Sequence, residues 1–459
     1  MKKNEELFSR GVVSFIDPDG VFQQKVEAKI RGEYKNDIVI KLGADPTRPD
    51  IHLGHAVILR KLRAFQDVGC KVIFLIGDYT TQIGDPTGKS KVRPEISQQE
   101  IETNMKSYID QVGKILNTDP AVFSWIRNSD WFTSITDISA NQGATVTING
   151  EGNGGHITVD ANSFVGKTAI FEETRMQKTH LHNKAIQTVS FSRVLSTLRH
   201  ITHSRLIERD MFQDRMKKGE ELYMHEMMYP VLQGIDSTVL ASIYGSCDLE
   251  IGGTDQLFNM LIGRDVMKMN RQEMQSVMAI DLLEGLDGKE KMSKSLDNYV
   301  GITDEPNDMY GKIMSAPDSL IARYFSLATY TPLSEVEEIK TSLEEGNINP
   351  RDLKMRLARE IVAIYHGDKA SVEAEKNFVD TFSKGKIPEN VPELSLDLDT
   401  DIVAVLVKSE CATSKTEARR LIENGAVTFL DEDTKITDFG HLVVKGTYRV
   451  GKHRFFKIV

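Results

Sequence analysis

The chain has 459 residues, of which 40% are hydrophobic and 27% are charged, and its formal net charge is −10. These values predict a globular protein of two or three domains. The negative charge excludes a protein that binds nucleic acid over its whole surface, so any such surface must be a local basic patch.

The cysteines and the apolar runs exclude other classes. Cys70, Cys247 and Cys411 are odd in number and far apart in the sequence, which argues against a disulfide framework or a cysteine zinc site. The first residues carry charge without a following apolar segment, and no apolar run reaches membrane-spanning length. We therefore expect a cytoplasmic protein without membrane contact.

The first elements predict a parallel, doubly wound sheet. Residues 1–36 have a charged, helical pattern that leads into a buried strand at 37–42. A helix starting near His55 follows, and a second buried strand occupies 71–77. Strand, helix and strand in close succession predict a Rossmann-like α/β fold.

The segment 43–55 joins the first strand to its helix. Thr47, His52 and His55 lie there beside free backbone N–H groups and the positive end of the helix dipole. Such a turn suits a phosphate, and Gly54 leaves room for a base or a ribose. The alternative is that the motif is a helix cap with two surface histidines.

The second strand ends in the glycine-containing, basic segment 77–93. Because sites in parallel sheets lie beyond the carboxyl ends of the strands, Asp85 is placed to bind a ligand ammonium group. Lys89 and Arg93 lie on a loop that is suited to cover phosphates. The alternative is an exposed basic loop without a ligand.

Residues 135–184 follow a helical pattern at 98–116 and differ from it in composition. They are rich in Gly, Asn and Thr and alternate in hydrophobicity, which we interpret as a β-hairpin insertion that turns at 149–155. Four histidines between positions 180 and 203 lack a carboxylate or cysteine at ligand spacing, so no metal site is expected. Helices resume at 188–216.

Tyr229, Gln233 and Asp236 are spaced to lie on one face of a helix. Three polar groups in an otherwise apolar stretch need hydrogen-bond partners, because burying them unpaired is unfavourable. A bound polar ligand would supply these partners, and an internal hydrogen-bond network is the alternative.

Two more turns carry candidate ligand groups. The strand at 249–256 ends in two glycines, which permit close backbone approach, and Asp255 is placed to accept from ribose hydroxyls. The glycine-flanked loop at 285–295 carries Lys291 and Lys294.

The C-terminal part predicts separate domains. From Lys435 to the end, six Lys or Arg face a single acid, Asp438, and such a basic surface suits an RNA backbone. We expect the following parts: a Rossmann-like domain at 1–300, a helical domain at 301–385, a linker at 386–400 and a small α+β domain at 401–459.

Two motifs resemble the signatures of the class I aminoacyl-tRNA synthetases, namely His52-Leu-Gly-His55 and Lys291-Met-Ser-Lys-Ser295. Within this class the chain resembles the bacterial-type tyrosyl-tRNA synthetases. Further motifs occur in that family's order: Asp45-Pro-Thr47, the stretch 83–89, Tyr229 with Gln233 and Asp236, the stretch 252–256, and a C-terminal module similar to S4 RNA-binding domains. The resemblance covers nearly the whole chain except about 135–184.

The resemblance implies a role for each matching position. The residues implied to act on the reacting phosphates are Thr47, His52, His55, Lys89, Arg93, Lys291 and Lys294. Those implied to bind tyrosine are Asp85, Tyr229, Gln233, Lys41 and Asp236, the last as acceptor for the phenol hydroxyl. Those implied to bind ATP are Gly43, Asp45, His52, His55, Gly252, Gly253, Asp255, Gln256, Lys291 and Lys294. Those implied to bind RNA are Lys415, Arg419, Arg420, Arg449 and Lys452.

The implied reaction joins L-tyrosine to the 3′ end of tRNA(Tyr) through a tyrosyl adenylate, with ATP and Mg²⁺ as substrate and no tightly bound protein metal. It needs no protein nucleophile, because positioning and electrostatic stabilisation supply most of the acceleration. The phenol contact implies discrimination against phenylalanine of roughly 10⁵-fold, a value that belongs to this enzyme family itself. A homodimer is implied as well.

Two features depart from the family pattern. Lys41 stands where the family often has a tyrosine that contacts the phenol, although one bacterial subgroup also carries Lys. The insertion at 135–184 lies where the family forms its dimer interface and approaches the tRNA acceptor end.

Three alternatives stay open. A tryptophanyl enzyme shares the fold and both signatures, but the trio at 229, 233 and 236 favours a phenol ligand. A small-molecule nucleotidyltransferase shares the first signature and the sheet, but is not expected to have the loop at 291–295 or the basic C-terminal module. A synthetase-like protein that binds RNA with a silent active site would have lost the signatures, and both are intact here.

Overall fold

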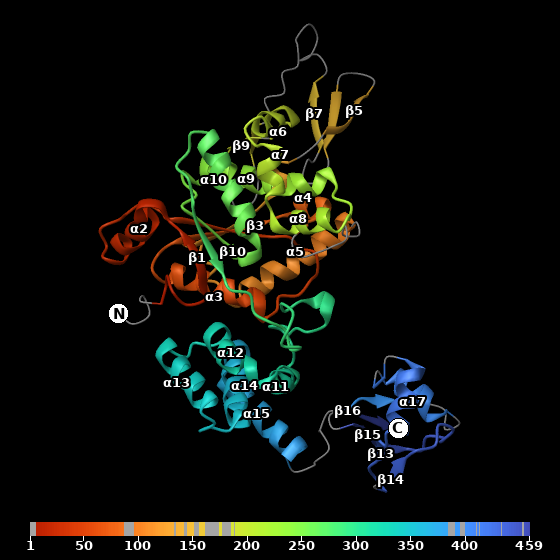
Figure 1. Ribbon diagram of the computed structural model, residues 1–459. Helices are drawn as coiled ribbons and strands as arrows, with labels where there is room; N and C mark the ends of the chain where they lie inside the picture. The colour runs from red at the N-terminus through yellow and green to blue at the C-terminus, as the bar shows by residue number, and fades with distance from the viewer. Residues whose placement is uncertain are drawn as a thin grey trace. The chain divides into compact units, whose positions relative to one another are not determined.

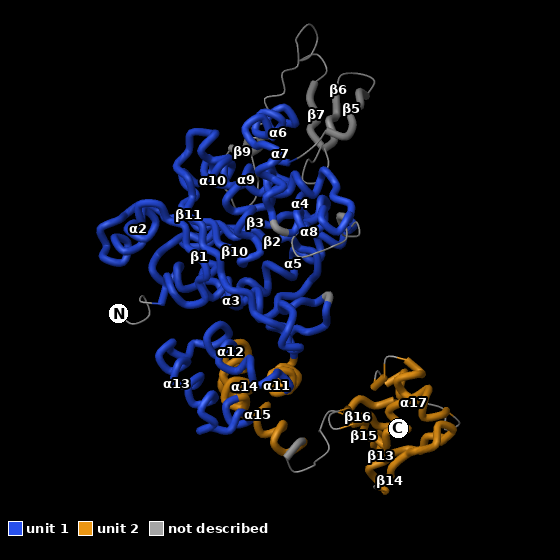
Figure 2. The backbone as a smooth tube through the Cα atoms, viewed as in Figure 1, with its two compact units in different colours: residues 1–304, 315–353 blue, residues 305–314, 354–459 orange. Residues whose placement is uncertain are grey.

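The structure, a computed structural model, divides into two compact units (Figure 2). Unit 1 comprises residues 1–304 and 315–353, and unit 2 comprises residues 305–314 and 354–459. The described residues are 6–86, 96–132, 135–141, 145–150, 156–160, 174–176, 185–187, 189–383, 391–394, 400–409, 411–412, 414–432, 434–451 and 454–459.

Unit 1 contains a six-stranded sheet with the order β1-β11-β10-β2-β3-β4, of which Figure 1 labels β1, β10 and β3. Neighbouring strands are parallel except at the edge, where β1 is antiparallel to β11. The strands are β1 (Val12–Ile16), β2 (Val39–Ala44), β3 (Lys71–Ile76), β4 (Phe123–Arg127), β10 (Leu249–Gly253) and β11 (Ser276–Ile280). This parallel sheet confirms the predicted Rossmann-like α/β class.

The predicted helical lead-in at 1–36 is wrong in part. It contains the helix α2 (Val21–Ile30), but Val12–Ile16 forms the edge strand β1. The β-branched residues of β1 favour an extended chain, and pairing with β11 satisfies its backbone groups.

The helices of unit 1 connect the strands. Two of them pack on the sheet, α3 on β3 and β10, and α10 on β10 and β11. The helices up to residue 304 are α2, α3 (Leu53–Asp67), α4 (Asp78–Ile83), α5 (Gln98–Val112), α6 (Phe191–Leu198), α7 (His203–Ile207), α8 (Asp210–Lys217), α9 (Met224–Tyr244) and α10 (Leu257–Met269).

The predicted insertion contains more strands than a single hairpin. β6 (Thr145–Gly150) and β7 (His156–Asp160) form the expected hairpin, and β5 (Ile135–Asn141) adds a third antiparallel strand beside β6. β8 (Thr174–Met176) and β9 (Ala185–Gln187) form a separate pair. The turn that we predicted at 149–155, between β6 and β7, lies largely outside the described residues.

The region predicted as a helical domain at 301–385 is helical but belongs to both units. Unit 1 contains α12 (Ile321–Ala328) and α13 (Leu333–Glu344), and unit 2 contains α15 (Asp368–Phe378) and most of α11 (Pro306–Ser315) and α14 (Pro350–His366). The first boundary between the compact units follows residue 304, close to the predicted boundary at residue 300.

The C-terminal residues form a five-stranded sheet with the order β12-β16-β15-β13-β14. Its apolar face and the helices α16 (Ile402–Lys408) and α17 (Lys415–Glu423) share one buried core. The strands are β12 (Glu393–Leu394), β13 (Val427–Phe429), β14 (Thr434–Ile436), β15 (Gly446–Val450) and β16 (Arg454–Ile458). The short strand β12 falls in the predicted linker 386–400, so part of that linker is structured.

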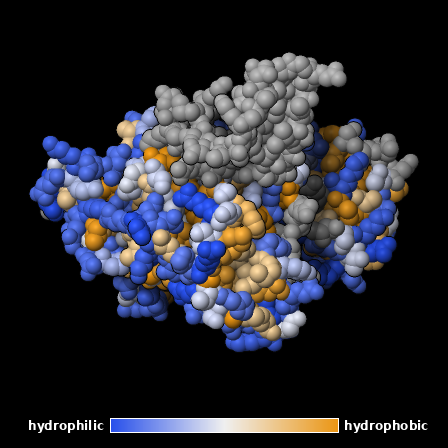
Figure 3. Space-filling view, turned by 90° about the horizontal axis from the view of Figure 1, so that it is seen from above, coloured by the Kyte–Doolittle hydropathy of each residue, from blue (hydrophilic) through white to orange (hydrophobic). Residues whose placement is uncertain are grey.

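The surface shows several exposed apolar side chains. Figure 3 shows one face, on which hydrophilic residues alternate with smaller hydrophobic areas. Phe191 is 76% exposed and Met224 is 71% exposed. Among the described residues, no helix combines the length and the hydropathy that a membrane span needs.

α9 and α10 approach each other closely at Gly234. A Cβ atom at this position would lie 2.9 Å from Val266 Cγ2 and 3.3 Å from the Cα atom of Gly263. The second contact is with backbone, which shifts less easily than a side chain. Gly234 therefore permits the packing that holds α9 near the sheet.

We expect Gly234→Ala to destabilise unit 1 by about 1–3 kcal/mol, because overpacking outweighs the gain in helix propensity. Gly311→Ala is the matched control, since Gly311 also lies in a helix but a Cβ there meets nothing within 4 Å. The control is expected to be neutral or stabilising. Urea unfolding measures both variants, and equal effects would contradict the packing argument.

Candidate active site

A cavity of about 910 Å³ lies at the carboxyl ends of β2, β3 and β10. The chain runs from β2 outward to β3 and β4, whereas β10 and β11 lie on the other side of β2. The strand order therefore reverses between β2 and β10, and open α/β sheets bind ligands at such a point. Most of the residues singled out in the sequence line this cavity.

The histidine motif forms one end of the cavity. His52 is the N-cap of α3, and its backbone N–H donates to His55 Nδ1 at 3.3 Å. The two rings stack with centroids 3.8 Å apart, and His52 is only 6% exposed. His52 is thus a helix cap, as the alternative interpretation held, but it is not a surface residue.

Both imidazoles are neutral. Burial, together with the charges of Lys294 and Lys291, lowers the pKa of His55 to about 3. Burial also holds the pKa of His52 far below its ordinary value. Because Nδ1 of neutral His55 accepts a hydrogen bond, its proton lies on Nε2 and is available as a donor.

Gly54 lines the cavity and also lies against the His52 ring. A Cβ atom there would lie 3.1 Å from Nδ1 of the His52 ring. Gly54 therefore leaves room for the neighbouring imidazole, and the predicted room for a base or a ribose stays a prediction.

The lysine loop lies at the same end of the cavity. Lys294 Nζ donates to the backbone oxygen of Asp50 and lies 5.7 Å from the ring centroid of Tyr108. Lys291 Nζ lies 2.8 Å from Asp255 Oδ2. Burial lowers the pKa of Lys294 to about 8, so it remains largely charged at neutral pH. The structure thus joins two motifs that are far apart in the sequence.

Asn298 and Asp287 hold the lysine loop, and neither was predicted. Asn298 Oδ1 accepts from the backbone N–H of Ser293 at 2.8 Å, and its Nδ2 donates to Asp287 Oδ2 at 2.8 Å. Asp287 also accepts from the backbone N–H groups of Lys289 and Glu290. These bonds define the path of the loop.

Asp45 positions Tyr229. Tyr229 Oη donates to Asp45 Oδ2 at 2.8 Å, and Thr80 Oγ1 donates to Asp45 Oδ1 at 2.9 Å. A Cβ atom at Gly77 would lie 2.1 Å from Asp45 Oδ1, so only glycine fits there. Gly77, which directly follows β3, is the sequence feature that could have indicated this contact.

Asp236 is held by two donors that the sequence did not reveal. Trp131 Nε1 donates to its Oδ1 at 2.8 Å, and Asn128 Nδ2 donates to its Oδ2 at 3.4 Å. Asp236 is 3% exposed, and burial raises its pKa to about 7 against the opposing effect of Lys41. Asn128 lies in the short 3-10 turn Asn128–Asp130 after β4.

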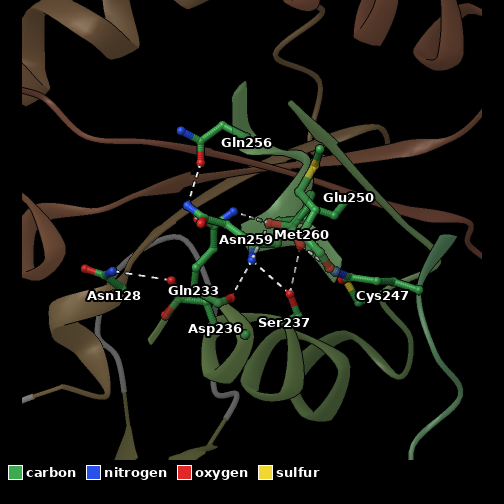
Figure 4. A network of polar contacts seen from close by, with 12 residues as sticks. Asn128, Gln233, Asp236, Ser237, Cys247, Glu250, Gln256, Asn259 and Met260 are labelled. Carbon is green, nitrogen blue, oxygen red and sulfur yellow. Dashed lines mark hydrogen bonds and ion pairs between the residues drawn. The ribbon is translucent and has the colours of Figure 1, made fainter. Parts of the chain in front are cut away.

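Asp85 and Gln256 form a second polar cluster. Gln256 Nε2 donates to Asp85 Oδ2 at 2.7 Å, and Arg209 lies 3.8 Å from Asp85 Oδ1. Asn259 Nδ2 donates to both Gln256 Oε1 and Gln233 Oε1 (Figure 4). Arg209 and Asn259 were not predicted, because no motif marks them.

Lys41 and Gln233 belong to a buried network around Glu250. Lys41 Nζ lies 2.9 Å from Glu250 Oε1 and donates to Gln233 O and Ser237 Oγ. These are three protein acceptors for three ammonium hydrogens. The role predicted for Lys41 at the phenol would require it to give up one of them. For Gln233, the internal network that we considered as the alternative is present.

The remaining predicted residues fall into two groups. Gly43, Gly252, Gly253, Thr47 and Asp255 line the cavity. Lys89, Arg93 and Lys452 lie outside the described residues. Lys415, Arg419 and Arg420 are exposed on α17, and Arg449 is half-buried on β15. Among the described residues, no three His, Cys, Asp or Glu side chains are grouped to hold a metal ion.

The cavity has two chemically distinct ends. One carries lysine cations and neutral imidazoles, which suit a charged phosphate chain. The other carries the carboxylates of Asp85 and Asp236 with Tyr229 and Gln233, which suit a small ligand with an ammonium group and a hydrogen-bond donor.

Comparison with known families gives two matches. The family described as tRNA synthetases class I (W and Y) matches residues 33–149 and 159–383, and that described as the Tyrosine--tRNA ligase SYY-like C-terminal domain matches residues 383–455. The first match includes most of the insertion at 135–184, where the sequence resemblance was expected to fail.

Curated relatives align over nearly the whole chain. A tyrosine--tRNA ligase of Carboxydothermus hydrogenoformans is 37% identical, with 100% of this chain and 98% of that protein covered. One of Desulfotalea psychrophila is also 37% identical, at 100% and 98% coverage. A tyrosine--tRNA ligase 2 of Vibrio vulnificus is 40% identical, at 91% and 90% coverage.

Solved structures show the same fold. A C-terminally truncated mitochondrial tyrosyl-tRNA synthetase of Aspergillus nidulans gives a TM-score of 0.55 at 20% identity and covers 83% of this chain and 94% of its own. A tyrosyl-tRNA synthetase of Archaeoglobus fulgidus complexed with L-tyrosine gives 0.53 at 18% identity and covers 82% and 100%.

Proposed function

This chain belongs to the class I tRNA synthetases of the tryptophan and tyrosine type, and we propose that it is a tyrosine–tRNA ligase. It activates L-tyrosine with ATP to tyrosyl adenylate and pyrophosphate and transfers tyrosine to the 3′ end of tRNA(Tyr). The observation that carries the tyrosine specificity is the buried carboxyl group of Asp236 in the cavity wall, which accepts two hydrogen bonds from the protein.

Asp236 supports a ligand that ends in a hydroxyl group. Its two oxygens each accept one bond from Trp131 or Asn128, and a carboxylate can accept about four bonds in all. The free lone pairs allow it to accept from a phenol. A phenylalanine ring would leave the remaining lone pairs of this buried carboxyl group without a donor, which opposes its binding.

The other groups at this end suit the α-amino group of tyrosine. Asp85 supplies the negative charge, and Tyr229 and Gln233 line the same cavity. The carboxylate of tyrosine is then directed toward the phosphate end. These assignments follow the family resemblance and the grouping of the side chains.

ATP occupies the end with His52, His55, Lys291 and Lys294, and Mg²⁺ enters with it as part of the substrate. The tyrosine carboxylate oxygen forms a bond to the α-phosphorus, and the bond from that phosphorus to the pyrophosphate oxygen breaks. The lysines and the Nε2–H of His55 stabilise the charge on the departing pyrophosphate. Lys89 and Arg93 are proposed to act there too.

The tRNA hydroxyl then attacks the carbonyl carbon of the adenylate, and AMP leaves. We assign tRNA binding in part to the S4-like C-terminal region, where Lys415 and Arg419 are exposed one helical turn apart on α17. A cytoplasmic homodimer is proposed as well. The exposed Phe191 and Leu195, one turn apart on α6, support a protein partner.

The alternative functions make different predictions. A tryptophanyl enzyme would bind the indole N–H at Asp236, and a nucleotidyltransferase would use no amino acid. A silent, RNA-binding relative would form no adenylate. The intact cation and imidazole groups around the cavity favour an active enzyme.

Exchange of labelled pyrophosphate into ATP, measured with each of the twenty amino acids, tests the proposal. We expect exchange with tyrosine, and about 10⁵-fold less with phenylalanine, as in this enzyme family. Exchange driven by tryptophan would assign the other specificity. Exchange with no amino acid would contradict the proposed activity.

We expect tyrosine affinity to increase as the pH rises from about 6 to 8. Asp236 is protonated below its pKa of about 7 and charged above it, and a charged carboxylate is the stronger acceptor. Asp236→Asn is expected to remove this pH dependence and to weaken tyrosine binding about 10- to 100-fold. Calorimetric titration of both proteins with tyrosine at several pH values measures the affinity and its pH dependence. ATP affinity is the control, and equal losses for both ligands would contradict the assignment.

We expect Lys415→Ala/Arg419→Ala to impair tRNA charging while adenylate formation stays unchanged. Removing each cation that binds a phosphate should reduce the slope of log affinity against log salt by about one. Lys340→Ala is the matched control, because Lys340 is an exposed lysine on another helix, α13. Loss of both activities in the double variant would indicate a structural role for these residues.

A further inference from the structure

The buried ion pair between Lys41 and Glu250 stands out within the cavity wall. Lys41 is 0% exposed and Glu250 is 1% exposed. They lie opposite each other on the neighbouring parallel strands β2 and β10, with Nζ and Oε1 2.9 Å apart. Either charge alone would be strongly unfavourable at this depth, so each requires the other.

The pair forms hydrogen bonds with two residues of α9, Gln233 and Ser237. Lys41 Nζ donates to the backbone oxygen of Gln233 and to Ser237 Oγ, both at 2.9 Å. Glu250 Oε1 accepts from Gln233 Nε2 at 3.0 Å, and its Oε2 accepts from Ser237 Oγ at 3.3 Å (Figure 4). Both the backbone and the side chain of Gln233 are thus held by the pair.

α10 leaves space for this network. Gln275 Nε2 also donates to Glu250 Oε2. A Cβ atom at Gly263 would lie 2.7 Å from Gln275 Nε2 and 3.2 Å from Glu250 Oε2. A side chain at Gly263 would displace both groups, so the glycine is needed where the network touches α10.

The same pair acts on Asp236 of α9. Lys41 of β2 lowers the pKa of Asp236, and Glu250 of β10 raises it. The uncharged groups around it come from three further elements. Asn128 and Trp131 after β4 donate to Asp236, Thr80 of α4 accepts from Asn128, and Asn259 of α10 donates to Gln233.

We infer that the Lys41–Glu250 ion pair is the positioning element of the amino-acid pocket. It holds Gln233 in place and sets the electrostatic field at Asp236, without donating a hydrogen bond to the ligand. The identity of that ligand as tyrosine rests on the proposed function. Lys41 thus acts on substrate recognition through its neighbours and not by direct contact with the phenol.

The titration of Asp236 tests this inference without any ligand. The indole N–H of Trp131 donates to Asp236, so its resonance in protein labelled with ¹⁵N-tryptophan reports the charge on that carboxyl group. The chain contains two tryptophans, and Trp125 provides an internal reference. Trp125→Phe assigns the two signals.

We expect the two halves of the pair to shift this titration in opposite directions. Glu250→Gln keeps the cation and should lower the midpoint by about one pH unit, and Lys41→Met keeps the anion and should raise it by a similar amount. The midpoint of the double variant Lys41→Met/Glu250→Gln should lie between those of the two single variants. If Lys41→Met fails to fold, Glu250→Gln and the double variant still give the required comparison.

Binding measurements provide a second test. Glu250→Gln and the double variant should weaken tyrosine binding about tenfold or more, with ATP binding changed less than about twofold. Glu226→Gln is the matched control, because Arg215 and Glu226 form another buried ion pair, 2.7 Å long, between α8 and α9. This control should lower thermal stability without moving the Trp131 titration.

The outcomes separate the two proposals. Single-variant midpoints that stay unchanged or move in the same direction would overturn the positioning role, as would equal losses of tyrosine and ATP binding. A wild-type protein without tyrosine-dependent exchange would contradict the proposed function instead. In that case the indole titration, which needs no tyrosine, still decides whether the ion pair controls Asp236.

Discussion

Backbone hydrogen bonds between residues 51–53 and 300–302 hold the phosphate end of the site together. Leu53 N–H donates to Val300 O at 3.0 Å, and Ile302 N–H donates to Ile51 O at 3.0 Å. The first segment leads into α3 with its two histidines, and the second follows the lysine loop. Lys294 therefore reaches Asp50, 244 positions away in the chain. Without this connection, closing so long a loop would oppose the contact.

Burial then divides the charges of the cavity. The stacked histidines are buried beside two lysines, so their pKa values fall and the lysines carry the positive charge. A neutral imidazole still donates one hydrogen bond, and it does so without repelling the neighbouring cations. Phosphate binding is thereby shared between charged lysines and uncharged donors.

The sequence predicted the parallel sheet and most of the lining residues, because these follow from local patterns. Buried runs identified β2 and β3, and motif spacing identified the residues at 52, 55, 229, 233 and 236. Asn128, Trp131 and Arg209 were missed because their roles depend on which segments meet in space. Strand β1 was missed because a short edge strand lies within a charged, helical-looking segment.

Lys41 shows why contacts between distant segments, which the sequence does not reveal, matter for assigning a role. The family resemblance placed it at the phenol, and its position in β2 is consistent with a residue that lines the pocket. The strand order puts β10 beside β2, and the register sets Glu250 opposite Lys41. No local pattern gives that register. A lysine at this depth needs a carboxylate partner. Because Lys41 also donates to Gln233 O and Ser237 Oγ, its ammonium group has no hydrogen left for a ligand. Its influence must then pass through Gln233 and Asp236, which the same pair contacts or polarises.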